Sequence, residues 1–165
     1  AEISALLAKL HPTLTDTDAD TLYHASPMHD IGKMTVPHEI LHKPGKYTPE
    51  EFEVMKSHTT NAYKLLSGSK RKLIKSAAII AYQHHEKWDG SGYPRGLKGS
   101  DIHIYGRIVA LADVFDALTH QRCYKTAWTV DDAVAFIQEQ RGYHFDPELV
   151  DLMISHLDQF ANIVK

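Results

Sequence analysis

Histidine is unusually frequent in this sequence of 165 residues, which holds 12 histidines against 9 glycines and 8 tyrosines. Histidine titrates near neutral pH and is the commonest metal ligand in proteins. Histidines scattered over a surface would need no special explanation, whereas histidines that flank apolar helix faces would indicate a site. The second pattern is found here, together with aspartates, in four separate segments that contain His29 and Asp30, His58, His84 and His85, and Asp113.

The spacing of these residues relative to apolar positions predicts that they point inward. His58 follows Met55 by three residues, so on a helix it lies beside the apolar face. Asp113 is placed in the same way on a later apolar stripe, and His84 and His85 continue the stripe of the helix before them. Any one of them alone is more often a hydrogen-bonded core histidine or an ion-paired carboxylate. Burying all of them without partners is costly, so the joint pattern favours a metal centre that gives each group a cationic partner.

The number of candidate ligands favours two metal ions over one. A catalytic ion typically keeps a position open for water or substrate, so these six side chains are too many for one ion and suit two. Asp30 or Asp113 would bridge the ions, and the remaining positive charge suits a hydroxide and a phosphoester anion, as in two-metal hydrolases. Nitrogen and oxygen donors suit iron, manganese or zinc. The single cysteine, Cys123, excludes an internal disulfide and a cysteine-rich zinc site.

An all-α fold is predicted for the elements that position these residues. The segment Thr48-Pro49-Glu50-Glu51 is a capping box with proline at the first helical position. Asp16 or Asp18 should cap an earlier helix that is kinked at Pro27 and ends at Gly32. The predicted helices span residues 1–10, 16–31, 48–68, 70–85, 104–118, 129–141 and 147–163, the last one capped by Asp146, and residues 34–47 and 86–103 are predicted to be loops. A loop as long as 86–103 is usually functional.

Composition and charge exclude several classes of protein. A hydrophobic content of 43% and a charged content of 24% are ordinary globular values. The net charge of −3 argues against binding to a nucleic acid polymer. The longest apolar run, around residues 77–82, is too short to cross a bilayer, and no signal-peptide pattern opens the chain. We therefore expect one cytoplasmic domain over residues 1–165, without a membrane segment. Its first helix lacks a cap before Ala1 and is expected to begin upstream, as is any sensory region.

Several motifs occur in a specific order along the chain. His29-Asp30-Ile31-Gly32-Lys33 is followed by His84-His85-Glu86 and by Asp89-Gly90-Ser91-Gly92-Tyr93-Pro94. The segments 112–119 and 144–147, together with Arg122, Tyr124 and Lys125, complete the set. At these residues the sequence resembles the HD-GYP family, the bacterial cyclic-di-GMP phosphodiesterases within the HD superfamily of metal-dependent phosphohydrolases. The resemblance covers residues 14–152.

The resemblance implies an HD-superfamily helical bundle with an irregular GYP loop, which is the glycine-rich segment 90–99 that contains Gly92-Tyr93-Pro94. It also assigns roles to individual residues. Asp30 and Lys33 would be catalytic, with Lys33 beside the scissile phosphate. Asp116 would orient a ligand or support the loop, whereas His144 and Asp146 are interpreted as structural. The implied metal ligands are His29, Asp30, His58, His84, His85 and Asp113, and the implied substrate-binding residues are Lys33, Gly92, Tyr93, Pro94, Arg122 and Lys125.

The sequence departs from the family pattern at one point. Family members carry a further histidine ligand on the first helix, and members with three metals add a glutamate one turn earlier, but both positions would lie before Ala1. Neither His11 nor His24 is expected to substitute, because His11 follows the helix end and His24 precedes the kink at Pro27. We therefore expect two divalent ions, iron or manganese, with a third only if upstream ligands exist.

The function implied by the resemblance is hydrolysis of cyclic di-GMP to linear pGpG, or further to GMP. An alternative is a catalytically impaired module that senses cyclic di-GMP or docks a partner protein through the GYP loop, such as a diguanylate cyclase-type signalling protein. The intact His29-Asp30 pair and Lys33 favour the enzyme, whereas the missing first-helix ligand favours the module. An HD phosphohydrolase for another nucleotide is disfavoured by the complete GYP loop.

Overall fold

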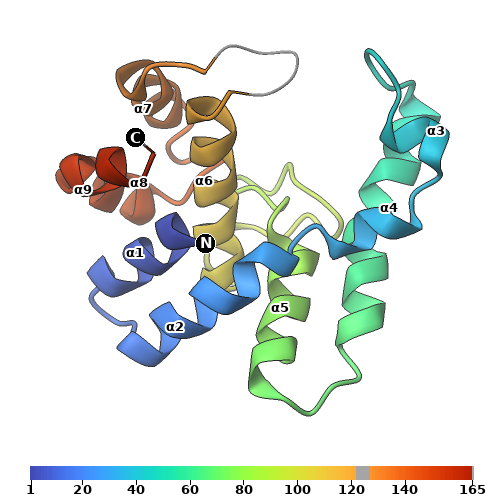
Figure 1. The fold of residues 1–165 in the computed structure, drawn as a ribbon, viewed down its shortest axis with the longest axis horizontal. Helices are drawn as coiled ribbons and strands as arrows, with labels where there is room; N and C mark the ends of the chain where they lie inside the picture. Colours follow the sequence, from blue (N-terminus) through green and yellow to red (C-terminus); the bar gives the residue numbers. More distant parts are fainter. Residues whose placement is uncertain (122–126, 165) are drawn as a thin grey trace.

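The helix α6 (Ile104–Thr119) lies at the centre of the protein in the computed structural model, which describes residues 1–121 and 127–164 (Figure 1). Ile108, Leu111 and Phe115 of α6 have no exposed surface, since other helices cover the helix on several sides. The other α-helices are α1 (Glu2–Leu10), α2 (Asp16–Ala25), α3 (His38–Leu41), α4 (Pro49–Leu66), α5 (Lys72–Gln83), α7 (Val130–Glu139), α8 (Pro147–Ser155) and α9 (Leu157–Ile163). Short 3-10 turns, named η1 (Ser26–Met28), η2 (Ile31–Thr35) and η3 (Gly99–Asp101), lie between them.

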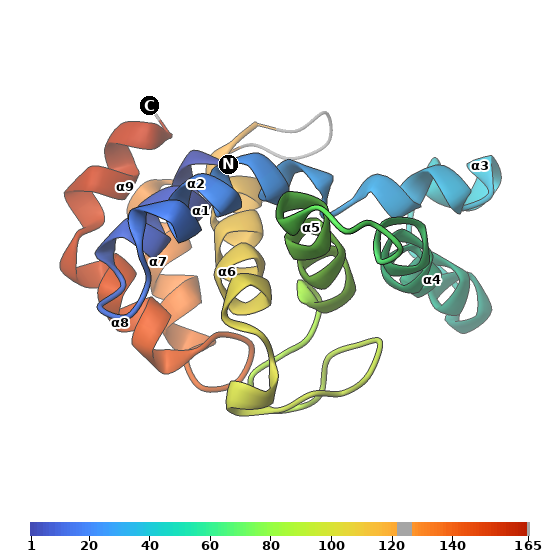
Figure 2. The same cartoon turned by 90° about the horizontal axis from the view of Figure 1, so that it is seen from below.

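The helices around α6 fall into two groups, as Figures 1 and 2 show. α1 packs against α2, α6, α8 and α9, and α7 and α8 also contact α6. On the other side, α5 packs against α6 and α2, and α4 packs against α5 and η2. The main apolar core contains buried residues from α1, α2, α5, α6, α7, α8 and α9 but none from α4. The position of α4 therefore depends on its contacts with α5 and η2.

The starts of the helices follow the capping signals in the sequence. The hydroxyl of Thr48 accepts a hydrogen bond from the N–H of Glu51, whose carboxylate accepts one from the N–H of Thr48, which confirms the predicted capping box. Asp146 caps α8, as predicted. At α2 the predicted cap is wrong, because Thr15 is the N-cap and Asp18 is its reciprocal partner three residues later.

The segment after α2 differs from the prediction of one kinked helix over residues 16–31. The α-helix ends at Ala25, and the chain continues through η1 and η2. Pro27 lies in the first turn of η1, where its missing N–H costs no hydrogen bond. Gly32 lies inside η2 and does not terminate a helix. His29 and Asp30 therefore lie on a short irregular link between two 3-10 turns.

Three other predicted boundaries need correction. Residues 34–47 are not entirely a loop, because η2 extends to Thr35 and α3 forms one helical turn. α5 ends at Gln83, so the two histidines that follow lie just beyond the helix. The predicted last helix is interrupted at His156, where the backbone leaves the helical region, and forms α8 and α9.

The prediction of a helical protein is confirmed over the described ranges. Within residues 1–121 and 127–164 no strand is found, and one isolated bridge joins Arg141 and Phe145. None of the described helices combines the length and the apolar character that crossing a membrane requires. The long segment 86–103 is irregular apart from η3, as the density of glycine and proline predicts.

Candidate metal centre

Asp30 lies where η1 and η2 meet, and Gly32 brings this link close to α4. A Cβ atom on Gly32 would lie 1.9 Å from the carbonyl oxygen of His58, which is far inside van der Waals contact. The absence of a side chain therefore allows η2 to lie directly against α4. As a result, Oδ1 of Asp30 lies 3.5 Å from Nε2 of His58 although the two residues come from different segments.

The rings of three candidate ligands are held by backbone carbonyl oxygens of the preceding turn. Nδ1 lies 2.8 Å from such an oxygen in His29, 2.7 Å in His58 and 3.1 Å in His84. A carbonyl oxygen only accepts hydrogen bonds, so Nδ1 must carry the proton in each ring. Nε2 is then the nitrogen with the free lone pair, and this is the arrangement that orients histidine towards a metal ion.

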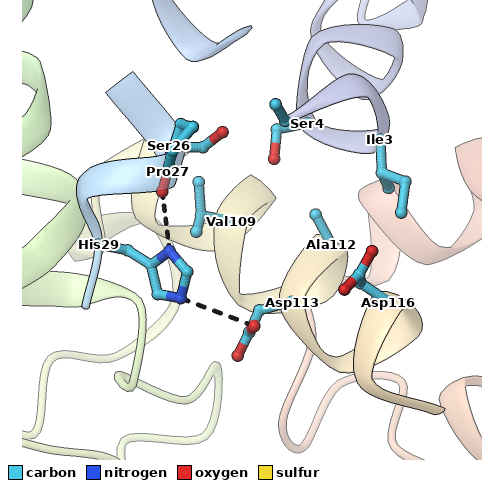
Figure 3. A pocket seen from close by; sticks show the side chains of 10 residues that line it. Ile3, Ser4, Ser26, Pro27, His29, Val109, Ala112, Asp113 and Asp116 are labelled. Carbon is cyan, nitrogen blue, oxygen red and sulfur yellow. Dashed lines mark hydrogen bonds and ion pairs between the residues drawn. The ribbon is translucent and has the colours of Figure 1, made fainter. Parts of the chain in front are cut away.

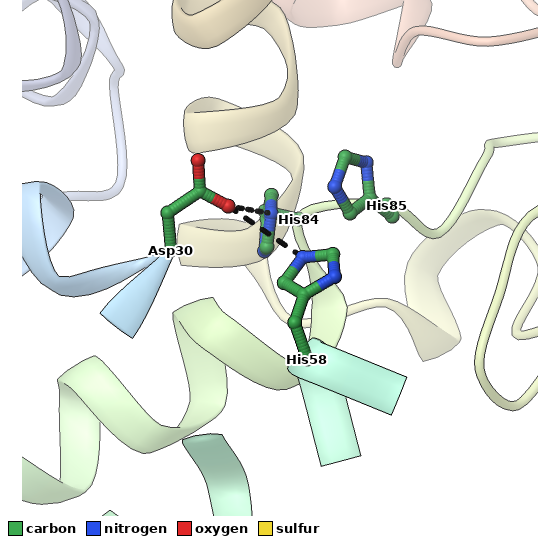
Figure 4. A group of neighbouring side chains, drawn as sticks. All are labelled: Asp30, His58, His84 and His85. Atoms are coloured by element: carbon green, nitrogen blue, oxygen red, sulfur yellow. Dashed lines mark ion pairs between the residues drawn. The ribbon is translucent and has the colours of Figure 1, made fainter. Parts of the chain in front are cut away.

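The free atoms of this group face one another, as Figure 4 shows. Oδ1 of Asp30 lies 3.5 Å from Nε2 of His58 and 3.7 Å from Nε2 of His84. These three atoms are buried, and they find no hydrogen-bond partner in the described part of the chain. With His85 included, one donor atom from each of the four residues lies within 4.8 Å of the others.

This arrangement is unfavourable unless a cation occupies it. Each buried polar atom without a partner costs about 1–3 kcal/mol, and lone pairs that face each other add repulsion. A divalent ion between the four side chains removes both costs. Imidazole nitrogen and carboxylate oxygen are ordinary ligands of zinc, iron and manganese. The residues therefore fit a divalent transition-metal ion.

The electrostatics of the cluster favour the protonation states that bind metal. Burial opposes ionisation of Asp30, but interactions with neighbouring histidines and with Lys33 outweigh it and hold the pKa of Asp30 well below its usual range. Burial, together with repulsion from neighbouring histidines, lowers the pKa of His85 to about 2. Burial also lowers the pKa of His58. At neutral pH the carboxylate of Asp30 is thus ionised and the imidazoles of His58 and His85 are neutral, which are the states that ligate a metal.

A second group of donor atoms lies on the other side of Asp30. Nε2 of His29 lies 3.3 Å from Oδ2 of Asp30 and 3.7 Å from Oδ1 of Asp113 on α6. Figure 3 shows His29 and Asp113 facing each other at a cavity of about 140 Å³ that is lined by α1, η1 and α6. Asp30 therefore directs one oxygen to each group. The six predicted ligands therefore lie in one region. Asp30, His58, His84 and His85 form the four-residue cluster, whereas His29 and Asp113 lie next to it and contact each other.

Lys33 places a positive charge beside this carboxylate. Its Nζ lies 2.5 Å from Oδ2 of Asp30, one turn of η2 away, and its side chain is 39% exposed. The ammonium group can therefore contact both the carboxylate and an anion from solvent. The catalytic role of Lys33 stays a prediction.

The GYP loop is anchored by the residue that directly follows the two histidines. The carboxylate of Glu86 is buried and accepts hydrogen bonds from the N–H groups of Arg95, at 2.8 Å, and Leu97, at 3.0 Å. These bonds draw residues nine and eleven positions later back onto the end of the His84-His85 segment. The sequence indicates Glu86 only as part of a motif and assigns it no role. An acid directly before a glycine-rich loop with many free N–H groups is the signal that could have revealed it.

Gly92 and Tyr93 pack this loop against the metal cluster. A Cβ atom on Gly92 would lie 2.3 Å from the backbone nitrogen of Lys87, so the turn requires glycine. The N–H of Tyr93 donates to the carbonyl oxygen of His85, and its ring stacks on the His85 ring with centroids 4.8 Å apart. The Tyr93–Pro94 bond is cis. The predicted GYP residues thus form a wall beside the cluster.

The hydroxyl of Tyr93 remains protonated at neutral pH. Burial and the charges of Asp30 and Asp113 raise the pKa of Tyr93 well above its usual range. A tyrosine in this state is neither a base nor a nucleophile at neutral pH. It can offer an aromatic face and a hydrogen bond.

Other predicted residues lie at or outside the edge of the site. The carboxylate of Asp116 lines the same cavity and lies 3.4 Å from the His120 ring. His11 contacts Thr13 and Glu148, and His24 contacts Asp20; neither belongs to the four-residue cluster. His144 stacks on Phe145 and Asp146 contacts Arg107, which agrees with structural roles. Arg122 and Lys125, predicted to hold substrate phosphate, lie outside the described residues.

Comparisons with known proteins identify related domains. The family model of the HD domain matches residues 1–149. The chain is 49% identical over 150 residues to the 3'3'-cGAMP-specific phosphodiesterase 2 of Vibrio cholerae, and the alignment covers 91% of this chain and 29% of that protein. It is 49% identical over 141 residues to a cyclic di-GMP phosphodiesterase of Thermotoga maritima, covering 86% of this chain and 38% of the relative. It is 48% identical over 150 residues to the cyclic di-GMP phosphodiesterase response regulator RpfG of Xanthomonas campestris, covering 91% and 40%.

A solved structure supports the fold. The crystal structure of the cyclic GMP-AMP-specific phosphodiesterase V-cGAP3 of V. cholerae matches 99% of this chain and 45% of its own chain, with a TM-score of 0.67 and 19% sequence identity. These likenesses confirm the predicted all-α HD-type fold and the resemblance that the motifs indicated. The chain spans well under half the length of the curated relatives cited above.

Proposed function

The chain belongs to the HD domain family, and from this premise we propose that it is a metal-dependent phosphodiesterase that hydrolyses cyclic di-GMP to linear pGpG. The observation that carries the proposal is the convergence of buried atoms without partners, namely Oδ1 of Asp30 and Nε2 of His58 and His84. Such a group is stable only around a cation. The relatives named above act on cyclic di-GMP or on 3'3'-cGAMP, according to their names, and this supports a cyclic dinucleotide as substrate.

Two ions are proposed, because the donor atoms form two groups with Asp30 between them. His58, His84 and His85 would hold one ion with Oδ1 of Asp30. His29 and Asp113 would hold the other with Oδ2 of Asp30. Iron or manganese remain the proposed metals on the basis of the resemblance, since nitrogen and oxygen donors alone would suit zinc as well.

The side chains of this site suit the hydrolysis of a phosphodiester. Divalent ions at this site would supply Lewis acidity towards phosphate and activation of water. The reaction adds the oxygen of one water to phosphorus, breaks one P–O3' bond and transfers a proton to the O3' leaving group. The ammonium of Lys33, next to Asp30, can stabilise charge on the phosphate oxygens or provide that proton. The neutral ring of Tyr93 covers His85 and excludes water from one side.

Further parts of the sequence-based hypothesis stay predictions. We propose that Arg122 and Lys125 hold the second phosphate, on the basis of the motif alone. Docking of a diguanylate cyclase-type protein on the GYP loop and a cytoplasmic location likewise rest on the resemblance. Hydrolysis beyond pGpG to GMP is a further proposal of the same kind.

The proposal is tested by elemental analysis of the purified protein combined with product chromatography on cyclic di-GMP. We expect about two equivalents of transition metal and a pGpG product whose formation stops after chelation. Binding of cyclic di-GMP without any turnover by metal-loaded protein would contradict the enzyme and favour the sensing module. Hydrolysis that continues in a metal-free protein would contradict the metal centre.

A further inference from the structure

An aromatic and cationic group extends from the metal cluster to the protein surface, and two of its three members have no role in the proposed function. It consists of Phe52 and Lys56 on α4 and Tyr93 on the GYP loop, and we call it the α4 platform. The ring of Tyr93 stacks on His85 with centroids 4.8 Å apart, and Phe52 meets Tyr93 edge to face at 6.1 Å. Nζ of Lys56 lies 4.8 Å from the centroid of Phe52 and 5.6 Å from that of Tyr93. A continuous series of ring contacts thus joins a candidate metal ligand to a surface residue.

The α4 platform presents both an aromatic face and a restrained positive charge. Phe52 is 42% exposed although it contacts Tyr93, so part of its surface is open to a ligand. The ammonium of Lys56 is held by the rings and by Oε1 of Glu53 at 2.7 Å, and its side chain is 27% exposed. A contact between Phe52 and Lys56 alone would be an ordinary pair one helical turn apart. The participation of Tyr93, which comes from a distant segment and touches His85, connects the pair to the site.

A nucleobase matches the chemistry of this platform. Bases stack on exposed aromatic side chains, and this is a principal source of affinity for unpaired nucleotides. A lysine near the edge of the base can donate to acceptor atoms on it. If one phosphate of a cyclic dinucleotide lies at the metal cluster, a base attached to the neighbouring sugar must lie beside it, and the platform borders the cluster on the Tyr93 side.

We propose that the α4 platform is a subsite for a guanine base, in which Phe52 stacks on the base and Lys56 donates hydrogen bonds to its O6 and N7 atoms. This inference rests on the proposed function, because it assumes a cyclic dinucleotide at the metal cluster. Guanine presents two adjacent acceptors, O6 and N7, whereas adenine presents the acceptor N7 beside the donor N6 amine. An ammonium group can satisfy both guanine atoms but meets a donor on adenine. Lys56 therefore selects guanine over adenine.

The test compares variants of the platform on cyclic di-GMP and on cyclic di-AMP. Phe52→Ala should raise the KM for both dinucleotides by about 5- to 150-fold, the range measured when an aromatic partner of a base is removed. Lys56→Met, which keeps the length and apolar stem of the side chain, should lower the preference for cyclic di-GMP over cyclic di-AMP by about 5- to 150-fold. Both substitutions should act mainly on KM and on the dissociation constant measured by calorimetry.

Two matched controls lie on the same helix. Leu65 is 60% exposed and Lys64 is exposed near the end of α4, so Leu65→Ala and Lys64→Met remove an apolar and a cationic side chain away from the platform. Neither should change the KM for either dinucleotide. Effects of Phe52→Ala or Lys56→Met no larger than those of the controls would overturn the proposal.

Other outcomes separate the subsite from the proposed function. If Lys56→Met raised the KM for cyclic di-GMP and for cyclic di-AMP by the same factor, Lys56 would bind phosphate, and the assignment of guanine would be overturned. If the variants hydrolysed bis(p-nitrophenyl) phosphate, which has no base, as poorly as the dinucleotides, the substitutions would damage the metal site. If wild-type protein binds cyclic di-GMP but does not hydrolyse it, the enzyme proposal fails while calorimetry on the variants still decides the subsite. Absence of both binding and hydrolysis by metal-loaded protein would overturn both.

Discussion

Substitution of Gly32 tests whether the close contact between η2 and α4 builds the metal centre. In Gly32→Ala the new Cβ would lie 1.9 Å from the carbonyl oxygen of His58, 2.8 Å from its carbonyl carbon and 3.0 Å from Cβ of Ala62. The first two atoms belong to the backbone of a helix, so they cannot move aside as a flexible side chain would. η2 and α4 must therefore separate, and this increases the distance between Asp30 and His58.

The magnitude of the effect can be worked out from this geometry. Inserting a methyl group into a packed contact typically lowers the free energy of unfolding by about 1–3 kcal/mol. A clash with rigid backbone should lie at or above the upper end of this range. For a protein of this size, about 3 kcal/mol corresponds to a decrease in Tm of roughly 6–12 °C. Differential scanning calorimetry measures this decrease, and elemental analysis measures the loss of bound metal that should accompany it.

Gly68→Ala is the matched control for this substitution. Gly68 follows α4, no atom lies within 4 Å of the position that an added Cβ would take, and its φ is not positive. Gly68→Ala should leave the Tm unchanged or raise it. Alanine lowers the conformational entropy of the unfolded chain, and this typically raises the free energy of unfolding by about 0.4–1 kcal/mol. If Gly32→Ala had the Tm and the metal content of Gly68→Ala, the argument that the Gly32 contact positions Asp30 would be refuted.

Three further predictions follow from the geometry of the site and its supports. His84→Ala should abolish metal-dependent turnover and lower metal content, whereas His42→Ala, at the exposed end of α3, should change neither; equal losses in both variants would contradict the ligand assignment. Glu86→Ala should leave the N–H groups of the GYP loop without their acceptor and increase amide hydrogen exchange there, and protection equal to wild type would contradict the anchoring role. Tyr105→Phe removes the hydrogen bond to Asp18 and should lower the free energy of unfolding by about 1 kcal/mol at pH 7. The pKa of Asp18 is lowered from 3.8 to about 2, mainly by the Tyr105 hydroxyl, so this contribution is present above about pH 4 and should disappear as the pH falls through 2, a trend that urea unfolding at several pH values would check.

The helices and the candidate ligands could be predicted because their signals are local. The capping box at Thr48 and the cap at Asp146 depend on residues within one turn, and both are found as predicted. The inward direction of His58 follows from its place in the period of an amphipathic helix, and the structure buries it to 1% exposure. These features need no knowledge of distant contacts.

The features that the sequence predicts wrongly or does not reveal depend on contacts between distant segments. Around Asp30 the sequence predicts a kinked helix in place of the 3-10 turns, since a proline inside an apolar pattern does not distinguish a kink from a break. It predicts a helix terminus at Gly32, because the close approach of this residue to His58 is visible only in three dimensions. The same holds for Glu86, whose partners lie nine and eleven residues later on the chain.

The break in the chain around Asp30 has a functional consequence that a continuous helix would not allow. On a regular helix, His29 and Asp30 would point about 100° apart, which does not suit one carboxylate that faces both His29 and the more distant His58 and His84. Between η1 and η2 the two oxygens of Asp30 point to different partners, with Oδ2 near His29 and Oδ1 near His58 and His84. Because α4 contributes no fully buried residue to the main apolar core, the contact between Asp30 and His58 and the packing of α4 on α5 and η2 largely fix its position. The carboxylate of Asp30, on this irregular link, therefore lies between the two groups of donor atoms. It contacts His58 on α4 and also His29, which in turn contacts Asp113 on the central helix α6.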